Sequence, residues 1–243
     1  MIKLLRYGLL LFIVCCQIAQ AQSNIDTLLV KELQLRFEAD QLAARNSVPP
    51  ASHSHLSLKE WNATKDSIYR SNQLRAEQIL NKYGYPGYDV LGKSGAYLFF
   101  ALVQHSDHDP EFQKRALNMM RQEVEYQNAN PQDFAFLSDR VALNTGGKQI
   151  YGTQVTYNLI SGKASPRPTI DPDQINERRA KVGLEPIETY LADMTASHMK
   201  NNSVTGGVTN VALLLLLGLS LAAISLTIIV HKVRKRKRRR LFS

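Results

Sequence analysis

The chain has 243 residues, with 30 lysines and arginines against 21 acidic residues, and a formal net charge of +9. Ten of the basic residues lie at the two ends, which carry no acid, so the rest of the chain has a net charge of −1. A nucleic-acid-binding surface is therefore not expected in the central part. The length suits one ordinary domain with appendages.

The N-terminus has the three parts of a secretory signal peptide. Lys3 and Arg6 precede an apolar run over residues 9–14, and Ala19-Gln-Ala21 forms a small-x-small cleavage site. We expect a signal peptide over 1–21 that is removed before Gln22; the alternative is an uncleaved membrane anchor. Cleavage would remove Cys15 and Cys16, the two cysteines of the chain, and leave no disulfide or thiolate. An exported domain without disulfides is typical of a bacterial envelope protein.

The first part of the central domain predicts two amphipathic helices. Apolar residues at helical spacing between 25 and 42 predict the first, with Asp40 and Gln41 off the apolar stripe. Residues 46–57 hold two prolines among small polar residues and predict a loop. A second helix is expected over 58–82, with Leu74 among its inward apolar positions, and a turn follows at 84–87.

Residues Gly87–Ser94 fit the phosphate-loop pattern G-x-x-x-x-G-K-[ST]. Such a loop cradles phosphates only where an apolar strand precedes it and a helix follows. Residues 81–86 are not a strand pattern, so we interpret the match as false and expect no nucleotide site.

A polar corner follows the next helix. Residues 95–103 are almost all apolar, as in a buried helix, and Gln104 stands at its end. Asp109 and Pro110 predict an N-cap and the first residue of a further helix, which extends to about residue 127. Between these helices, His105 and Asp107 are candidates for an acid–base pair, and His105 and His108 are weak candidates for metal ligands; the alternative is a structural role.

Residues 132–143 predict a helix with apolar side chains on two faces. Asp139 and Arg140 then lie between buried faces, so Arg140 either closes an ion pair, with Asp139 as the expected partner, or points into a cleft. Residues 149–157 alternate as a strand does, and Gly152 within them indicates a bulge or a close backbone approach. A turn at 161–163 leads to a short partner strand.

Two more helices are expected before the end of the domain. Asp171 and Gln174 fit a capping box, and the helix that they open stops at Gly183. The last helix begins at Pro186 and is expected to end near His198.

The C-terminal part predicts a membrane span. Residues 208–230 carry no charge and, as a helix, are about 34 Å long, enough to cross a bilayer. The basic tail over 231–243 is expected to stay cytoplasmic, with residues 22–200 outside and 201–207 as a tether. Two alternatives are a buried core helix and a sorting tail that is removed.

Several short motifs resemble a bacterial family known as domain of unknown function 6624. They are Gly84-Tyr-Pro-Gly87, Gln104-His-Ser-Asp107, Ser138-Asp-Arg-Val141, Gln149-x-Tyr-Gly-Thr-Gln154 and Arg178-Arg-Ala-x-x-Gly-Leu184. The resemblance covers residues 28–192 and includes Asp40 and Gln41. It implies a single exported domain and assigns no activity to it.

We therefore expect a mainly α fold of the α+β class: a compact helical domain with one small β-hairpin, a signal peptide and one C-terminal transmembrane helix. Two functions remain open, and no cofactor is expected. The first is a binding module for a small molecule or a protein, anchored in the lipid bilayer through residues 208–230. The second is an extracytoplasmic hydrolase or metal-dependent enzyme. The catalytic candidates are His105, Asp107 and Arg140, and the ligand-binding candidates are Gln104, Asp139, Gln149, Tyr151 and Gln154.

Overall fold

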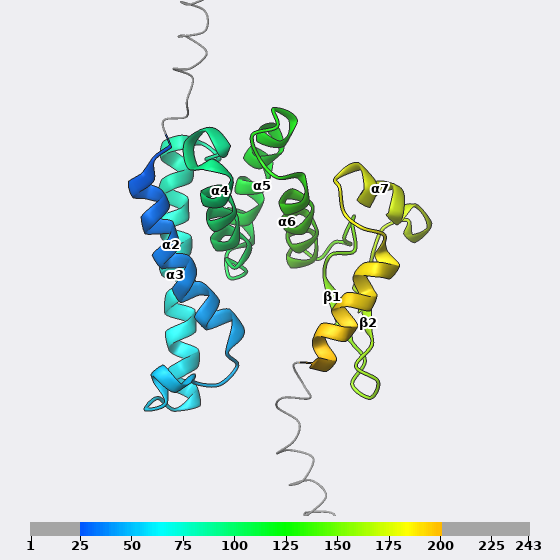
Figure 1. Cartoon of the computed structure of the whole chain (residues 1–243), viewed down its shortest axis with the longest axis horizontal. Helices are drawn as coiled ribbons and strands as arrows, with labels where there is room; N and C mark the ends of the chain where they lie inside the picture. The colour runs from blue at the N-terminus through cyan, green and yellow to red at the C-terminus, as the bar shows by residue number, and fades with distance from the viewer. Residues whose placement is uncertain (1–24, 201–243) are drawn as a thin grey trace, which may run out of the picture. The chain divides into compact units, whose positions relative to one another are not determined.

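The computed structural model describes residues 25–200 (Figure 1). Among the described residues, the first compact unit covers 25–155 and Pro166–Ile187, and the second covers Thr156–Ser165 and 188–200. The helices of the first unit are α2 (Thr27–Arg45), α3 (Leu58–Tyr83), α4 (Tyr88–Gln104), α5 (Pro110–Glu125), α6 (Pro131–Asn144) and α7 (Ile175–Lys181). Two 3-10 turns, η1 (Ala51–His53) and η2 (Pro172–Gln174), complete it. The predicted mainly helical fold with one small hairpin is confirmed.

Helices α2 to α6 share one hydrophobic core. α4 lies at its centre, packs against α2, α3, α5 and α6, and buries Phe99, Leu102 and Val103. Leu33 of α2 and Phe112 of α5 are fully buried in the same core. A side chain at Gly95 would place its Cβ 2.8 Å from a methyl group of Val30, so this glycine permits the close approach of α2 and α4.

Local capping signals set where these helices begin. Asp26, Ser57, Asp109 and Asn130 each accept a hydrogen bond from a backbone N–H in the first turn of the helix that follows. Ser57 forms a complete capping box with Glu60. The predicted cap at Asp109 is confirmed, because these signals act within a single turn and do not depend on the rest of the fold.

Two details of the helical region differ from the prediction. Leu74 is 59% exposed, and Asp40 is fully buried although it stands off the apolar stripe. Both helices pack against several neighbours, so one apolar stripe does not mark the whole buried surface.

Gly87–Ser94 is the N-cap and first part of α4, which bends at Gly92 (φ 65°). The segment before it is a turn after α3, as expected of a false match.

The predicted strand over 149–157 is wrong for most of its length. Only β1 (Val155–Tyr157) pairs with β2 (Ala164–Pro166), in an antiparallel hairpin. Gln149 instead forms an isolated parallel bridge with Thr169. Between Gln149 and β1, the carboxylate of Asp139 accepts hydrogen bonds from backbone N–H groups that would otherwise pair with a neighbouring strand.

The last two helices begin and end differently from the prediction. Asp171 has a positive φ of 35° and its side chain caps nothing, so the predicted capping box is absent from η2. The last helix occupies residues 187–200 and therefore continues past His198. Methionine and lysine, which follow at 199 and 200, are both good helix formers.

Within residues 25–200, no helix is both long and apolar enough to cross a membrane. The predicted signal peptide (1–21), tether (201–207), transmembrane helix (208–230) and basic tail (231–243) lie outside the described residues.

Candidate functional site

The polar corner after α4 collects side chains from four helical regions. We call Asp40, Tyr69, His105, Asp107 and Arg140 the His105 cluster. Asp40 comes from α2, Tyr69 from α3, His105 and Asp107 from the end of α4 and the following loop, and Arg140 from α6. The fold therefore joins residues that are spread over about one hundred positions of the sequence.

A buried carboxylate holds the imidazole of His105. The Nδ1 atom of His105 lies 2.6 Å from Oδ2 of Asp40, and the Asp40 side chain is completely buried, whereas that of His105 is 18% exposed. An ionised carboxylate only accepts hydrogen bonds, so Nδ1 carries the proton and donates it. In the neutral imidazole the other ring nitrogen, Nε2, is then an acceptor.

Arg140 forms its ion pair with Asp107. Its Nε and Nη2 atoms donate to the two carboxylate oxygens at 2.7 and 2.6 Å, in a bidentate geometry, and Asn144 and Gln113 donate to the same carboxylate. Burial raises the pKa of Asp107, but the hydrogen bonds and the charge of Arg140 outweigh burial and leave that pKa lowered. The ion pair of Arg140 is thus confirmed, but the expected partner Asp139 was wrong.

Tyr69 completes the cluster. Its ring meets the His105 ring edge-on, with 6.0 Å between the centroids. Burial raises the pKa of the Tyr69 phenol, and the charges of Asp40 and Asp107 add to the rise while Arg140 opposes it. Tyr69 is therefore close enough to all three charged groups to be influenced by them.

The cluster contains polar atoms without a protein partner. Within residues 25–200, the Tyr69 hydroxyl, Nε2 of His105 and Nη1 of Arg140 have no hydrogen-bond partner. The buried Oδ1 of Asp40 also lacks one in this part of the chain. An unpartnered buried carboxylate oxygen is unfavourable, and such groups in native proteins call for an explanation.

Asp139 serves a different purpose, although it is the neighbour of Arg140. It is fully buried and accepts hydrogen bonds from the backbone N–H groups of Ile150, Tyr151 and Thr153, at 2.6, 2.9 and 2.8 Å, and from the Thr153 hydroxyl at 2.9 Å. A carboxylate that accepts four hydrogen bonds has its acceptor positions filled. Asp139 therefore shapes the loop 150–153.

Gln149 and Gln154 hold the two ends of the same loop. The buried Gln149 side chain donates to the carbonyls of Gln154 and Arg167 and accepts from the backbone N–H of Gln154. The Tyr151 carbonyl accepts from the buried Arg179 guanidinium at 2.7 Å. These contacts give the candidates Gln149, Tyr151 and Gln154 structural roles, and their part in ligand binding stays a prediction.

The remaining candidates are Gln104 and His108. The carbonyl of Gln104 accepts a hydrogen bond from the side chain of Gln113 at 2.9 Å, and His108 is exposed. Across residues 25–200, no group of three or more histidine, cysteine or acidic side chains is arranged to hold a metal ion.

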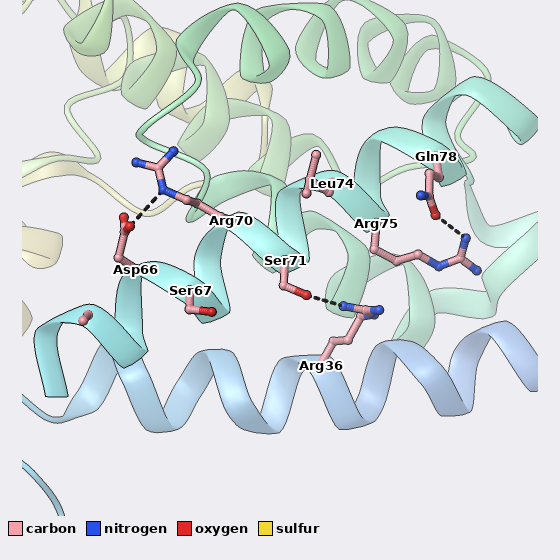
Figure 2. Close-up of a pocket in the computed structure, with 9 residues that line it drawn as sticks. Arg36, Asp66, Ser67, Arg70, Ser71, Leu74, Arg75 and Gln78 are labelled. Carbon is pink, nitrogen blue, oxygen red and sulfur yellow. Dashed lines mark hydrogen bonds and ion pairs between the residues drawn. The ribbon is translucent and has the colours of Figure 1, made fainter. Parts of the chain in front are cut away.

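A surface groove between α2 and α3 is lined by three arginines but by none of the predicted site residues (Figure 2). Its volume is about 570 Å³. Glu32 pairs with Arg36 at 2.9 Å and with Arg75 at 2.8 Å, and Arg70 pairs with Asp66. The Arg75 hydrogen bond, with help from Arg36, lowers the pKa of Glu32 to about 2. The three arginines are thus paired with two carboxylates, those of Glu32 and Asp66.

The sequence patterns did not select three residues as site candidates that the structure draws attention to: Asp40 and Tyr69, which belong to the His105 cluster, and Asp133, which has a perturbed pKa. The sequence did hold a clue to Asp40, because this residue belongs to the family pattern, but it held no clue to Tyr69. Burial raises the pKa of Asp133 to about 6. Perturbed carboxylates mark functional sites only in combination with other catalytic or binding groups, and Asp133 lies at the start of α6, outside the His105 cluster.

The comparisons with known proteins identify a family but no activity. No curated protein and no solved structure is detectably similar to this chain. Residues 27–200 match a family of unknown function, DUF6624. That range contains the His105 cluster and almost all of the described residues, and the chain belongs to this family.

Proposed function

We propose that this protein is a membrane-anchored extracytoplasmic module that binds a small anionic ligand at the His105 cluster. The observation that carries the proposal is a set of unused polar atoms in one cluster: the Tyr69 hydroxyl, Nε2 of His105, which is a donor when the imidazole is protonated, and Nη1 of Arg140. None of the three has a protein hydrogen-bond partner within residues 25–200. Hydroxyl, imidazolium and guanidinium groups together suit a carboxylate or a phosphate.

The surroundings of the donors favour binding. Asp40 fixes the orientation of His105, and Asp107 fixes that of Arg140 through two parallel hydrogen bonds. Donors that are already held in place lose little conformational freedom when a ligand arrives. The negative charges of Asp40 and Asp107 also weaken the attraction of the cluster for anions, so we expect modest affinity for simple anions.

The proposed location comes from the sequence. A signal peptide over 1–21 would export residues 22–200, and a span over 208–230 would hold them at the membrane through the tether 201–207, with the basic tail 231–243 in the cytoplasm. The absence of mature cysteines agrees with a bacterial envelope protein. The ligand would then be a metabolite or a partner group of the envelope.

The ligand proposal is tested by thermal unfolding of the full-length protein in detergent, with millimolar phosphate, sulfate or succinate as probes. A ligand at ten times its Kd adds about 1.4 kcal/mol of stability. We expect an upward shift of Tm for the wild type that His105→Asn and Arg140→Gln abolish. The matched controls His108→Asn and Arg70→Gln change an exposed histidine of the same corner and an arginine outside the cluster, and should keep the shift.

An equal shift in all four variants, or no shift of the wild type with any of the three anions, would contradict anion binding at this cluster. A shift lost only in Arg70→Gln would place the anion in the groove of Figure 2 instead.

A second candidate function is hydrolysis, and the Asp40–His105 pair favours it. A histidine whose Nδ1–H is held by a carboxylate presents Nε2 as a general base, which can take a proton from water as the water attacks a substrate. Asp107, the partner expected from the sequence, contacts Arg140, so the orienting carboxylate in this candidate is Asp40. Turnover of ester or phosphoester substrates that His105→Asn abolishes and His108→Asn preserves would favour hydrolysis over simple binding.

A further inference from the structure

The tip of the β-hairpin exposes two adjacent aliphatic side chains. Leu159 and Ile160 have relative exposures of 102% and 99%, the highest among the exposed large hydrophobic residues of the described chain. Single exposed apolar residues are common on protein surfaces, but two fully exposed neighbours at the tip of a hairpin form a small continuous apolar surface.

Several hydrogen bonds hold the turn that carries them. The Asn158 carboxamide oxygen accepts hydrogen bonds from the backbone N–H groups of Ile160 and Ser161, at 3.0 and 2.9 Å. The Gly162 N–H donates to the Asn158 carbonyl, and the Asn158 N–H donates to the Lys163 carbonyl. These hydrogen bonds define the shape of the turn that displays Leu159 and Ile160.

Contacts with the last helix show which way the tip points. Within the second compact unit, the Ala164 N–H donates to the Thr195 hydroxyl at 2.9 Å. Farther toward the tip, the Tyr157 ring stacks on His198, with centroids 3.9 Å apart, and Gly162 lies beside His198 and Met199. The hairpin thus runs along the helix of residues 187–200 toward its C-terminal end, as Figure 1 also shows.

The chain beyond this helix leads directly to the predicted membrane span. Lys200 is the last described residue, and the uncharged run begins eight positions later at Val208. Even a fully extended chain would cover only about 29 Å over that interval. If residues 208–230 span the membrane, the bilayer surface is therefore within reach of the hairpin end that carries Leu159 and Ile160, because Gly162 of the same turn lies beside Met199.

We infer that the hairpin tip inserts Leu159 and Ile160 into the interfacial region of the bilayer to which the chain is anchored. This inference rests on the membrane anchor of the proposed function and is independent of the His105 cluster. Apolar side chains on an otherwise polar surface partition into the boundary between headgroups and acyl chains. With the span, the tip would form a second point of contact and restrict the rotation of the second unit.

The test uses full-length protein in liposomes, in a background with Cys15→Ala and Cys16→Ala. An environment-sensitive fluorophore is attached to Ile160→Cys, to Leu216→Cys within the predicted span, or to Leu35→Cys, a 69% exposed leucine of α2 that serves as the control. Lipids that carry a nitroxide near the headgroup quench only probes at the interface.

We expect the label at Ile160 to shift to the blue and lose most of its emission with these lipids, while the label at Leu35 keeps its emission. Deep-nitroxide lipids should quench the label at Leu216. Quenching at Leu216 without quenching at Ile160 would overturn the hairpin inference and leave the anchor intact. A blue shift at Ile160 without lipid quenching would also overturn it, in favour of contact with a second protein. Loss of quenching at both positions would reject the anchor as well.

Discussion

Asp40 and His105 are the pair on which the candidate site depends. The carboxylate is completely buried, and its Oδ1 has no partner among residues 25–200. Its Oδ2 interacts with the His105 imidazole at 2.6 Å and with the Gln41 side-chain amide at 3.2 Å, so the imidazole is the shorter of two contacts that offset the cost of burying the charge. Breaking a buried pair by removing one partner is strongly destabilising because the other group is left buried and uncompensated. The same contact also fixes which nitrogen of His105 faces a ligand.

A double-mutant cycle would measure this contact. We expect His105→Ala to lower the free energy of unfolding by about 3 kcal/mol, because Asp40 loses its histidine partner and stays buried with the Gln41 side-chain amide as its remaining donor. Asp40→Ala in the His105→Ala background should cost much less than Asp40→Ala alone, with a coupling energy of about 1.5 kcal/mol or more. Urea unfolding of the four proteins gives the result.

The control cycle pairs Asp40→Ala with His108→Ala, which changes an exposed histidine of the same loop. That cycle should be additive within about 0.5 kcal/mol. Equal coupling in both cycles would show that Asp40 acts through the loop as a whole.

At the scale of elements, the loop between α6 and β1 depends on one buried carboxylate and one glycine. Asp139 accepts hydrogen bonds from three backbone N–H groups of the loop, and Gly152 adopts a φ of 70°. A Cβ atom at Gly152 would lie 2.7 Å from Cδ1 of Ile175 and 3.0 Å from Cδ1 of Ile187. The predicted close backbone approach at Gly152 is confirmed, although no strand surrounds it.

Gly152→Ala should therefore be much more harmful than the same change at Gly146, which has a φ of 80° but no atom within 4 Å of the added Cβ. Gly146→Ala bears only the left-handed backbone strain, about 1 kcal/mol. Gly152→Ala adds overpacking against two isoleucines, for a total of about 3 kcal/mol. Chemical denaturation of both variants measures the difference, and equal losses would refute the role of close packing.

At the scale of the whole molecule, the structure describes a helical unit and a smaller unit of hairpin and last helix, and each has its own contacts. The proposed binding site lies in the first and the proposed bilayer contact in the second. The predicted membrane anchor and the predicted export signal, on which the location in both proposals rests, lie outside residues 25–200.

The orientation in the membrane is a prediction for the intact chain. Eight basic residues follow the uncharged run 208–230, and positive charges beside a span stay in the cytoplasm. A reporter that is active only in the cytoplasm should be active when fused after Ser243. Replacing the eight basic residues by glutamine is the control, and it should weaken the orientation. An inactive cytoplasmic reporter together with activity of an exported one at the same position would reverse the proposed topology.

The helices of this protein could be located from the sequence because their signals are local. Asp109 with Pro110, the capping Ser57 and the turn after Tyr83 each act within a few residues, so their effects do not depend on distant parts of the fold. The reliance on local signals also explains an error. Alternation over 149–157 predicted one continuous strand, but the carboxylate of Asp139, more than ten positions away, accepts hydrogen bonds from N–H groups in the first part of that range, and only Val155–Tyr157 forms a strand.

The sequence by itself determined the helical class, the family and the polar character of the corner at 104–110. Only the tertiary structure decided which side chains meet there. His105 binds Asp40 from 65 positions away, and Arg140 binds Asp107 from 33 positions away, in preference to its neighbour Asp139. The physical reason is geometric: adjacent residues on a helix point in different directions, and a charged side chain pairs with whichever group the packing of other helices brings within hydrogen-bonding distance.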